Sequence, residues 1–186
     1  MIDLQKANEW QKRDEETGLL FPWLVESFLE ELKTWDLKNK KVYEIGLGAS
    51  TVWWSRECME LYGVDNNKEY FQSLCDFFDK NGDGSLMRMI IGVREKKEDY
   101  IGYITVGFDL YDIIIVDGDP VEWRDDCIKA ALNCINKGGK LIVDNWLQPS
   151  VWMASEETQA LLRDYPSKIY KQESHPDWQT AVFDII

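Results

Sequence analysis

The stretch Val42-Tyr43-Glu44-Ile45-Gly46-Leu47-Gly48-Ala49-Ser50-Thr51 decides how this chain is expected to fold. An apolar run carries an acidic residue near its end, and a G-x-G turn and a helix-forming segment follow. Glycines allow a sharp turn and let a ligand approach the backbone closely. The amino terminus of a helix offers free N–H groups and positive potential, which suit a carboxylate or phosphate. The stretch therefore predicts a strand, a ligand-binding turn and a helix that Ser50 or Thr51 caps.

A second apolar run, from Leu61 to Val64, ends in Asp65. A carboxylate at the end of a second strand can accept hydrogen bonds from both hydroxyls of a ribose. The glycine turn and Asp65 together indicate a nucleoside-containing cofactor at the switch point of an open sheet. The alternative interpretation, a pair of loop glycines and a solvated acid, is weaker because strands and helices alternate along the chain.

Short apolar runs alternate with segments of helical periodicity over the remaining sequence. Runs such as 113–116 are apolar throughout, which is typical of strands buried on both faces of a parallel sheet. The last two strands are separated by too few residues for a helical crossover and should pair antiparallel. The pattern predicts an α/β fold with a doubly wound, mostly parallel seven-stranded sheet and an antiparallel C-terminal strand. The expected strands are 41–45, 61–64, 87–91, 112–116, 140–143, 167–171 and 179–185, and the expected helices are 22–35, 50–58, 68–81, 121–136 and 155–165.

The 186 residues fit a single domain, 1–186, in which 1–36 form a helical cap or lid and 37–186 form the core. The net charge of −13 disfavours nucleic acid and anionic membranes as partners, since both repel acidic surfaces. The four cysteines form no C-x-x-C pair, the amino terminus is polar, and no apolar run is long enough to span a membrane. These features predict a cytoplasmic protein that acts on a small molecule.

Two kinds of nucleoside cofactor compete for the glycine turn. A dinucleotide site prefers G-x-G-x-x-G, but Thr51 stands where the third glycine would be. The order Glu44-x-Gly46-x-Gly48, followed by Asp65, resembles the class I S-adenosylmethionine-dependent methyltransferases. The segments 111–119 and 136–145 and the antiparallel last strands also resemble this family. The resemblance implies the Rossmann-like methyltransferase fold.

The resemblance also implies S-adenosylmethionine as the cofactor, with particular contacts. Glu44 and the glycines would meet its amino-acid end, Asp65 its ribose, and Asp117 its ammonium group or the reaction centre. Backbone atoms near Gly92 are expected at the adenine, because the end of the third strand supplies no acidic or polar side chain for it. The expected cofactor-binding residues are Glu44, Gly46, Gly48, Ser50, Thr51, Asp65, Asn66, Gly92, Val93 and Asp117.

The implied activity is methyl transfer to a small-molecule substrate at oxygen or nitrogen. Alignment of the nucleophile supplies much of the rate, and an alcohol or phenol also needs a base or a metal. The alternatives are an NAD-dependent oxidoreductase or nucleotide-sugar enzyme, for which a Tyr-x-x-x-Lys site is missing, and a non-catalytic domain that binds the cofactor.

A metal and three side chains are candidates for the catalytic role. Asp117, Asp144 and Asn145 resemble the Mg²⁺ ligands of catechol-type O-methyltransferases, but Pro120 stands where that family often has a lysine. The alternative is that Asp144 caps a loop and Asn145 makes a turn. The candidate catalytic side chains are Asp117, Asp119 and His175. Asp119 is also suited to cap a helix that starts at Pro120, and His175 to an exposed loop.

Overall fold

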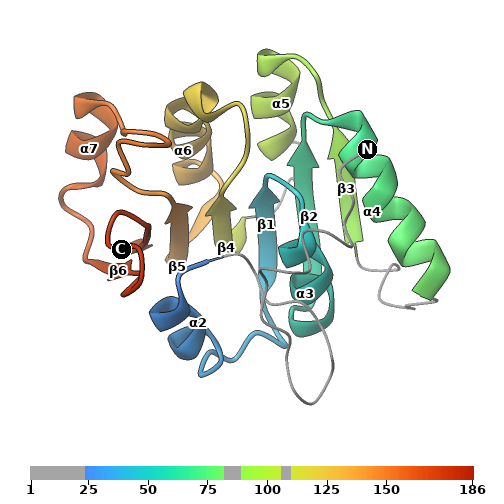
Figure 1. Cartoon of the computed structure of the whole chain (residues 1–186), viewed down its shortest axis with the longest axis horizontal. Helices are drawn as coiled ribbons and strands as arrows, with labels where there is room; N and C mark the ends of the chain where they lie inside the picture. Colours follow the sequence, from blue (N-terminus) through green and yellow to red (C-terminus); the bar gives the residue numbers. More distant parts are fainter. Residues whose placement is uncertain (1–23, 82–88, 106–109) are drawn as a thin grey trace.

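The computed structural model describes residues 24–81, 89–105 and 110–186, and their centre is a seven-stranded sheet (Figure 1). The strand order is β3-β2-β1-β4-β5-β7-β6. Strands β3, β2, β1, β4 and β5 are parallel, whereas β7 pairs antiparallel with both β5 and β6. This confirms the predicted mixed sheet. The strands are β1 (Lys41–Ile45), β2 (Glu60–Asp65), β3 (Met89–Val93), β4 (Tyr111–Val116), β5 (Ile135–Asp144), β6 (Ser167–Lys171) and β7 (Gln179–Asp184).

Helices pack on both faces of the sheet, as a doubly wound fold requires. On one face, Phe28 and Trp54 pack against strand residues that include Ile115. On the other face, Tyr100 and Ile128 pack in a second cluster with strand residues that include Ile114. The order of helices is α2 (Glu26–Leu32), α3 (Ala49–Glu57), α4 (Lys68–Asn81), α5 (Lys97–Ile104), the 3-10 helix η2 (Val121–Trp123), α6 (Arg124–Leu132) and α7 (Glu156–Leu162).

The helix expected at 121–136 is wrong only in its last four residues. The helix ends at Leu132, and β5 begins at Ile135 rather than at residue 140 and continues through Gly138 and Gly139. Gly138 has φ +78°, and a Cβ at Gly139 would lie 2.8 Å from the Asp112 carbonyl oxygen. The glycines therefore permit an irregular strand pairing, whose register shifts opposite the start of β4.

Other elements also depart from the expectation, including α2 and α7, which are both shorter than the expected helices. Helix α5 was not predicted, because its eight residues show only the buried pair Tyr100 and Ile104 as a helical signal. Strand β3 ends at Val93 rather than at 91, since Gly92 and Val93 continue the pairing with β2. The first two residues of the expected strand, 87 and 88, lie outside the described residues.

Part of the expected N-terminal cap is packed on the sheet. The described part consists of α2 and the residues just before it, and the remainder lies outside the described residues. The side chains of Val25, Phe28 and Leu32 are buried, and the Val25 N–H donates to Thr180 Oγ1 at 3.5 Å. Helix α2 therefore contributes to the core of the protein, and a division into cap and core at residue 36 stays a prediction. No helix in the described parts of the chain has the length and apolarity to cross a bilayer.

Because the centre of β4 is buried, shortening a side chain there should cost much stability. Ile114 is 0% exposed and Ile169, on edge strand β6, is 46% exposed. We expect Ile114→Ala to lower the free energy of unfolding by about 3–4 kcal/mol and Ile169→Ala to lower it by less than about 1 kcal/mol, since only the first leaves a cavity. Urea unfolding of both variants measures the difference. Equal losses would contradict the arrangement of the sheet.

Candidate cofactor site

The carboxyl ends of the central strands bring acidic residues side by side. Ile45 of β1 pairs with Val116 of β4 and also with the penultimate residue of β2. The next residues along β2, β1 and β4 are Asp65, Gly46 and Asp117, respectively. They therefore lie next to one another, in this order, at the same edge of the sheet. The glycine turn stands between the two carboxylates.

The row continues into β5 and β7. Val116 pairs with Val143, so that Asp117 and Asp144 are neighbours, and Asp144 pairs with Thr180. The Thr180 hydroxyl donates to Asp144 Oδ1 at 2.5 Å. Because successive side chains of a strand alternate between faces, Asp117 and Asp144 point to the face that α2 and α3 cover. We call Asp65, Gly46, Asp117, Asp144 and Thr180 the carboxyl-edge row.

The glycine turn is held to β2 by Asp65. The Leu47 N–H donates to Asp65 Oδ2 at 2.9 Å, and the Asn67 N–H donates to Oδ1 at 2.6 Å. Gly46 has φ +94°, and a Cβ there would lie 2.5 Å from Gly118 Cα. A glycine is therefore required at this position. Asp65 orders the turn in addition to any contact with a ribose.

The two residues expected to cap α3 act differently. Thr51 is buried at the third position of the helix, and its Oγ1 accepts a hydrogen bond from the Gly48 N–H at 2.7 Å. Ser50 donates its hydroxyl hydrogen to Glu44 Oε1. Both side chains therefore stabilise the start of α3, but Ser50 does so by holding the acid of β1.

Glu44 is the acid with an unsatisfied oxygen. The side chain is 1% exposed, and its Oε2 has no hydrogen-bond partner. Burial raises the pKa of Glu44 to about 7, although the side chains of Ser50 and Thr51 work in the opposite direction by hydrogen bonding. A buried carboxylate oxygen without a partner is costly. Glu44 is consequently suited to receive a cationic group beside the glycine turn.

Arg124 joins the ends of β4 and β5. Its guanidinium, 4% exposed, donates from Nη2 to Asp117 Oδ1 at 3.2 Å and from Nε to the Gly118 carbonyl at 2.8 Å. From Nη1 it donates to the Asp144 carbonyl at 2.9 Å and to Asn145 Oδ1 at 3.1 Å. Burial and the neighbouring Asp144 raise the pKa of Asp117, while Arg124 opposes this rise. A permanent positive charge therefore lies among these acids.

The expected Mg²⁺ site does not fit these contacts. The structure does bring Asp117, Asp144 and Asn145 together, but around the guanidinium of Arg124. The Asp144 carboxylate also accepts from Thr180. Within the described ranges, no three His, Cys, Asp or Glu side chains are grouped as metal ligands. The sequence offered no sign of Arg124, because an arginine followed by two acids reads as an exposed helix face.

The corner at the end of β3 contains an aromatic side chain that was not predicted. A Cβ at Gly92 would lie 3.0 Å from the Tyr103 ring of α5, so this helix packs closely on the strand. The Arg94 guanidinium lies 4.3 Å from the centre of the Tyr103 ring and donates to the Val93 carbonyl at 2.7 Å. Asn66 is half-buried beside Asp65. The expected adenine corner is therefore formed by backbone and by Tyr103.

The remaining two catalytic candidates are exposed. Asp119 follows Gly118, and Pro120, not Asp119, is the residue directly before η2. His175 lies in the connection from β6 to β7, where its ring stacks on Trp178 at 4.5 Å. Its Nδ1 is 3.0 Å from Ser174 Oγ. The contacts of His175 are thus with its own loop and not with the carboxyl-edge row.

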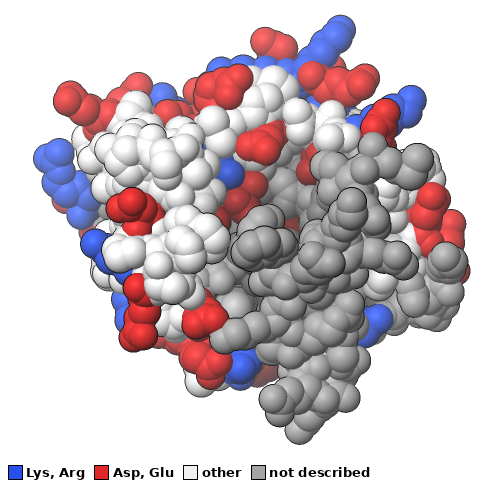
Figure 2. All heavy atoms as spheres, viewed as in Figure 1, with Lys and Arg blue, Asp and Glu red and all other residues white. Residues whose placement is uncertain are grey.

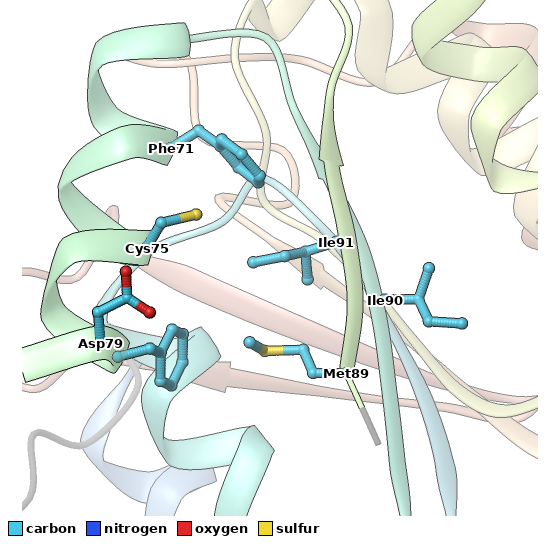
Figure 3. A pocket seen from close by; sticks show the side chains of 7 residues that line it. Phe71, Cys75, Asp79, Met89, Ile90 and Ile91 are labelled. Atoms are coloured by element: carbon cyan, nitrogen blue, oxygen red, sulfur yellow. The ribbon is translucent and has the colours of Figure 1, made fainter. Parts of the chain in front are cut away.

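A separate apolar hollow lies between α4 and β3 (Figure 3). Its volume is about 380 Å³, and Phe71 and Cys75 line it from the helix. Met89 and Ile91 face the helix from the strand, whereas Ile90 points away. These strand residues precede the carboxyl end of β3, so the hollow is distinct from the carboxyl-edge row.

Comparisons with solved structures agree with this geometry. The O-methyltransferase TomG from Streptomyces achromogenes, crystallised with S-adenosylmethionine, has a TM-score of 0.64 at 15% identity over 100% of this chain and 96% of its own. The N-methyltransferase NodS from Bradyrhizobium japonicum has 0.62 at 15% identity over 86% and 93%. An rRNA methylase from Streptococcus thermophilus has 0.59 at 14% identity over 86% and 93%.

Neither a protein-family model nor a curated protein matches the sequence. The likeness to solved structures therefore concerns the fold, because each identity is low. The strand order and the antiparallel β7 are shared with these enzymes. The chain has the Rossmann-like fold of the class I S-adenosylmethionine-dependent methyltransferases.

Proposed function

We propose that the protein transfers a methyl group from S-adenosylmethionine to an oxygen or nitrogen atom of a small molecule. The observation that supports this most is the unpaired, buried Oε2 of Glu44 at a glycine turn, with Asp65 and Asp117 on either side of Gly46. S-adenosylmethionine carries a sulfonium and an ammonium group, and both are cations. An acidic edge with one carboxylate oxygen free is complementary to such a molecule.

Each acid is suited to a different part of the cofactor. Glu44 would accept a hydrogen bond from the ammonium group. Asp65 already accepts from two backbone N–H groups, but each carboxylate oxygen has a second lone pair, so both can still accept from ribose hydroxyls. Asp117 lies between them and the end of β5. When bound, the cofactor supplies an electrophilic methyl group, and the chain aligns the nucleophile with it.

Asp117 is the proposed proton acceptor for the substrate. It belongs to the carboxyl-edge row, and burial raises its pKa, which brings an acid closer to the range of a useful base. Asp119 and His175 stay predictions, and either would have to reach the substrate from an exposed position.

Charge favours a small molecule over a nucleic acid as the methyl acceptor. The net charge is −13, and basic side chains form no broad patch on the described part of the face in Figure 2. Binding to a phosphate backbone depends on lysine and arginine contacts. The O- and N-methyltransferases among the structural neighbours support the same choice, whereas the rRNA methylase shows that the fold alone does not decide it.

Calorimetric titration separates this proposal from its alternatives. We expect S-adenosylmethionine to bind and NAD⁺ not to bind. NAD⁺ binding alone would favour an oxidoreductase or nucleotide-sugar enzyme instead. A domain that binds the cofactor without catalysing would give the same titration, but no methyl transfer to any member of a small-molecule panel.

Replacement of Asp65 should weaken cofactor binding. Asp65→Asn keeps the shape and one acceptor oxygen, but it removes the charge that strengthens the hydrogen bonds from the ribose and sets an amide NH₂ against one of the two backbone N–H groups from which Asp65 accepts. We expect the dissociation constant for S-adenosylmethionine to rise roughly tenfold or more. Asp99→Asn, on the exposed surface of α5, is the matched control and should bind normally. Unchanged affinity in a folded Asp65→Asn protein would remove Asp65 from the site.

The raised pKa of Glu44 predicts pH-dependent binding. Its carboxyl group is protonated below about pH 7, and a bound ammonium favours the ionised form, so binding tightens as the pH rises through 7. We expect a dissociation constant roughly eightfold higher at pH 6 than at pH 7.5. In Glu44→Gln this contribution should disappear, which titrations at both pH values measure. An equal pH dependence in Glu44→Gln would assign the effect to another group.

The free protein should show the opposite trend in stability. Because the folded pKa of Glu44 lies above its ordinary value, the folded state binds the proton more tightly than the unfolded state does. The contribution of Glu44 to stability is therefore present at low pH and is lost as the pH rises through 7.

A further inference from the structure

Arg124 is the first residue of α6, yet its guanidinium is buried among four oxygen atoms. The acceptors are a carboxylate oxygen of Asp117, the carbonyl oxygens of Gly118 and Asp144, and the amide oxygen of Asn145, at 2.8 to 3.2 Å. All four come from the ends of β4 and β5. Oxygen atoms of these kinds are the ligands that hard divalent cations prefer. The four oxygen atoms are thus of the kinds that bind a metal ion, but the group they surround is the guanidinium of an arginine.

The same contacts hold an unusual turn after β5. Asn145 has φ 53° and Leu147 has φ 51°, which are left-handed conformations that side chains other than glycine adopt at a cost. Asn145 is fixed on both sides, since its Oδ1 accepts from Arg124 and its Nδ2 donates to Gln148 Oε1 at 3.1 Å. Arg124 therefore links the turn after β5 to the acid after β4.

Electrostatics favour a cation at this place. Asp117 and Asp144 are neighbours in the carboxyl-edge row, and Glu44 and Asp119 add further negative charge around Asp117. Neighbouring carboxylates repel each other unless a positive charge offsets theirs, and here Asp144 is buried while the Asp117 side chain is 33% exposed. The charged group that faces them from α6 is Arg124, whose guanidinium also lies 5.9 Å from the Trp152 ring.

We propose that the Arg124 guanidinium takes the place of a divalent metal ion at the ends of β4 and β5, so that this site works without a metal. Arg124 is then a positioning residue, which holds Asp117 and Asn145 in the orientation that the methyl-transfer site needs. The positioning role rests on the proposed function, whereas the replacement of a metal ion by the guanidinium does not.

Manganese titration of the unaltered protein tests the first part. Electron paramagnetic resonance measures free Mn²⁺ directly, and we expect no site to be occupied at millimolar Mn²⁺. One bound Mn²⁺ per chain that Asn145→Leu releases would overturn the proposal, because the oxygens would then serve a metal. This result does not depend on whether S-adenosylmethionine binds.

Chemical rescue tests whether the guanidinium is the required cation. Arg124→Ala leaves the buried acceptors and Asp117 without their partner, and we expect its unfolding temperature to fall by roughly 10 °C. Methylguanidinium at millimolar concentration should restore much of this loss by entering the vacated space. Arg163→Ala, at the exposed end of α7, is the matched control and should neither lose stability nor respond. A folded Arg124→Ala protein that ignores methylguanidinium would contradict the proposal.

A lysine variant covers the case in which Arg124→Ala does not fold. Arg124→Lys keeps the charge but cannot reach four acceptors in a plane, so we expect partial stability and weaker binding of S-adenosylmethionine than in the unaltered protein. Stability and cofactor affinity equal to those of the unaltered protein would contradict the positioning role. If the unaltered protein binds no S-adenosylmethionine, the proposed function fails, and the manganese and rescue results still decide the role of the guanidinium.

Discussion

The repulsion between carboxylates at the ends of adjacent strands is the constraint on which this structure depends. Parallel strands that end at the same edge bring their last side chains together, and here these include Asp65, Asp117 and Asp144. Glu44 lies on β1, two residues before Gly46 of the same edge. Glu44, Asp65 and Asp144 are buried, whereas the Asp117 side chain is 33% exposed, and loss of solvent contact raises the pKa of each acid. The fold has to supply a partner to every one of them.

The partners differ along the row, and this difference gives the site its polarity. Backbone N–H groups of the glycine turn satisfy Asp65, and the Arg124 guanidinium satisfies Asp117. The Thr180 hydroxyl donates to Asp144 and accepts from the Val25 N–H, so Thr180 also connects the row to the start of α2. Glu44 alone among these four acids keeps a buried oxygen without a partner. A cationic ligand at the glycine turn completes the set, which is why the geometry favours S-adenosylmethionine.

Much of the fold followed from the sequence because its signals are local. The glycine turn, the apolar run of β4 and the short connection between β6 and β7 predicted the mixed sheet, and the bounds of β1, α4 and β6 agree with the expectation.

The roles of Glu44 and Asp65 as binding residues remain predictions, but the sequence placed both at the correct strand ends. Arg124 was missed because its partners are six to 21 residues away and lie at the ends of two strands. No local pattern distinguishes such an arginine from one on a solvated helix. The error at 121–136 has a similar origin, since the glycines of β5 serve a strand pairing with β4 that only the folded sheet reveals.

A crystal structure of the chain with S-adenosylhomocysteine measures the central claim most directly. The account predicts the ammonium nitrogen of the ligand within about 3 Å of Glu44 Oε2 and both ribose hydroxyls at the same distance from the Asp65 carboxylate. A ligand bound away from the glycine turn, or one that leaves Glu44 Oε2 without a partner, would contradict it.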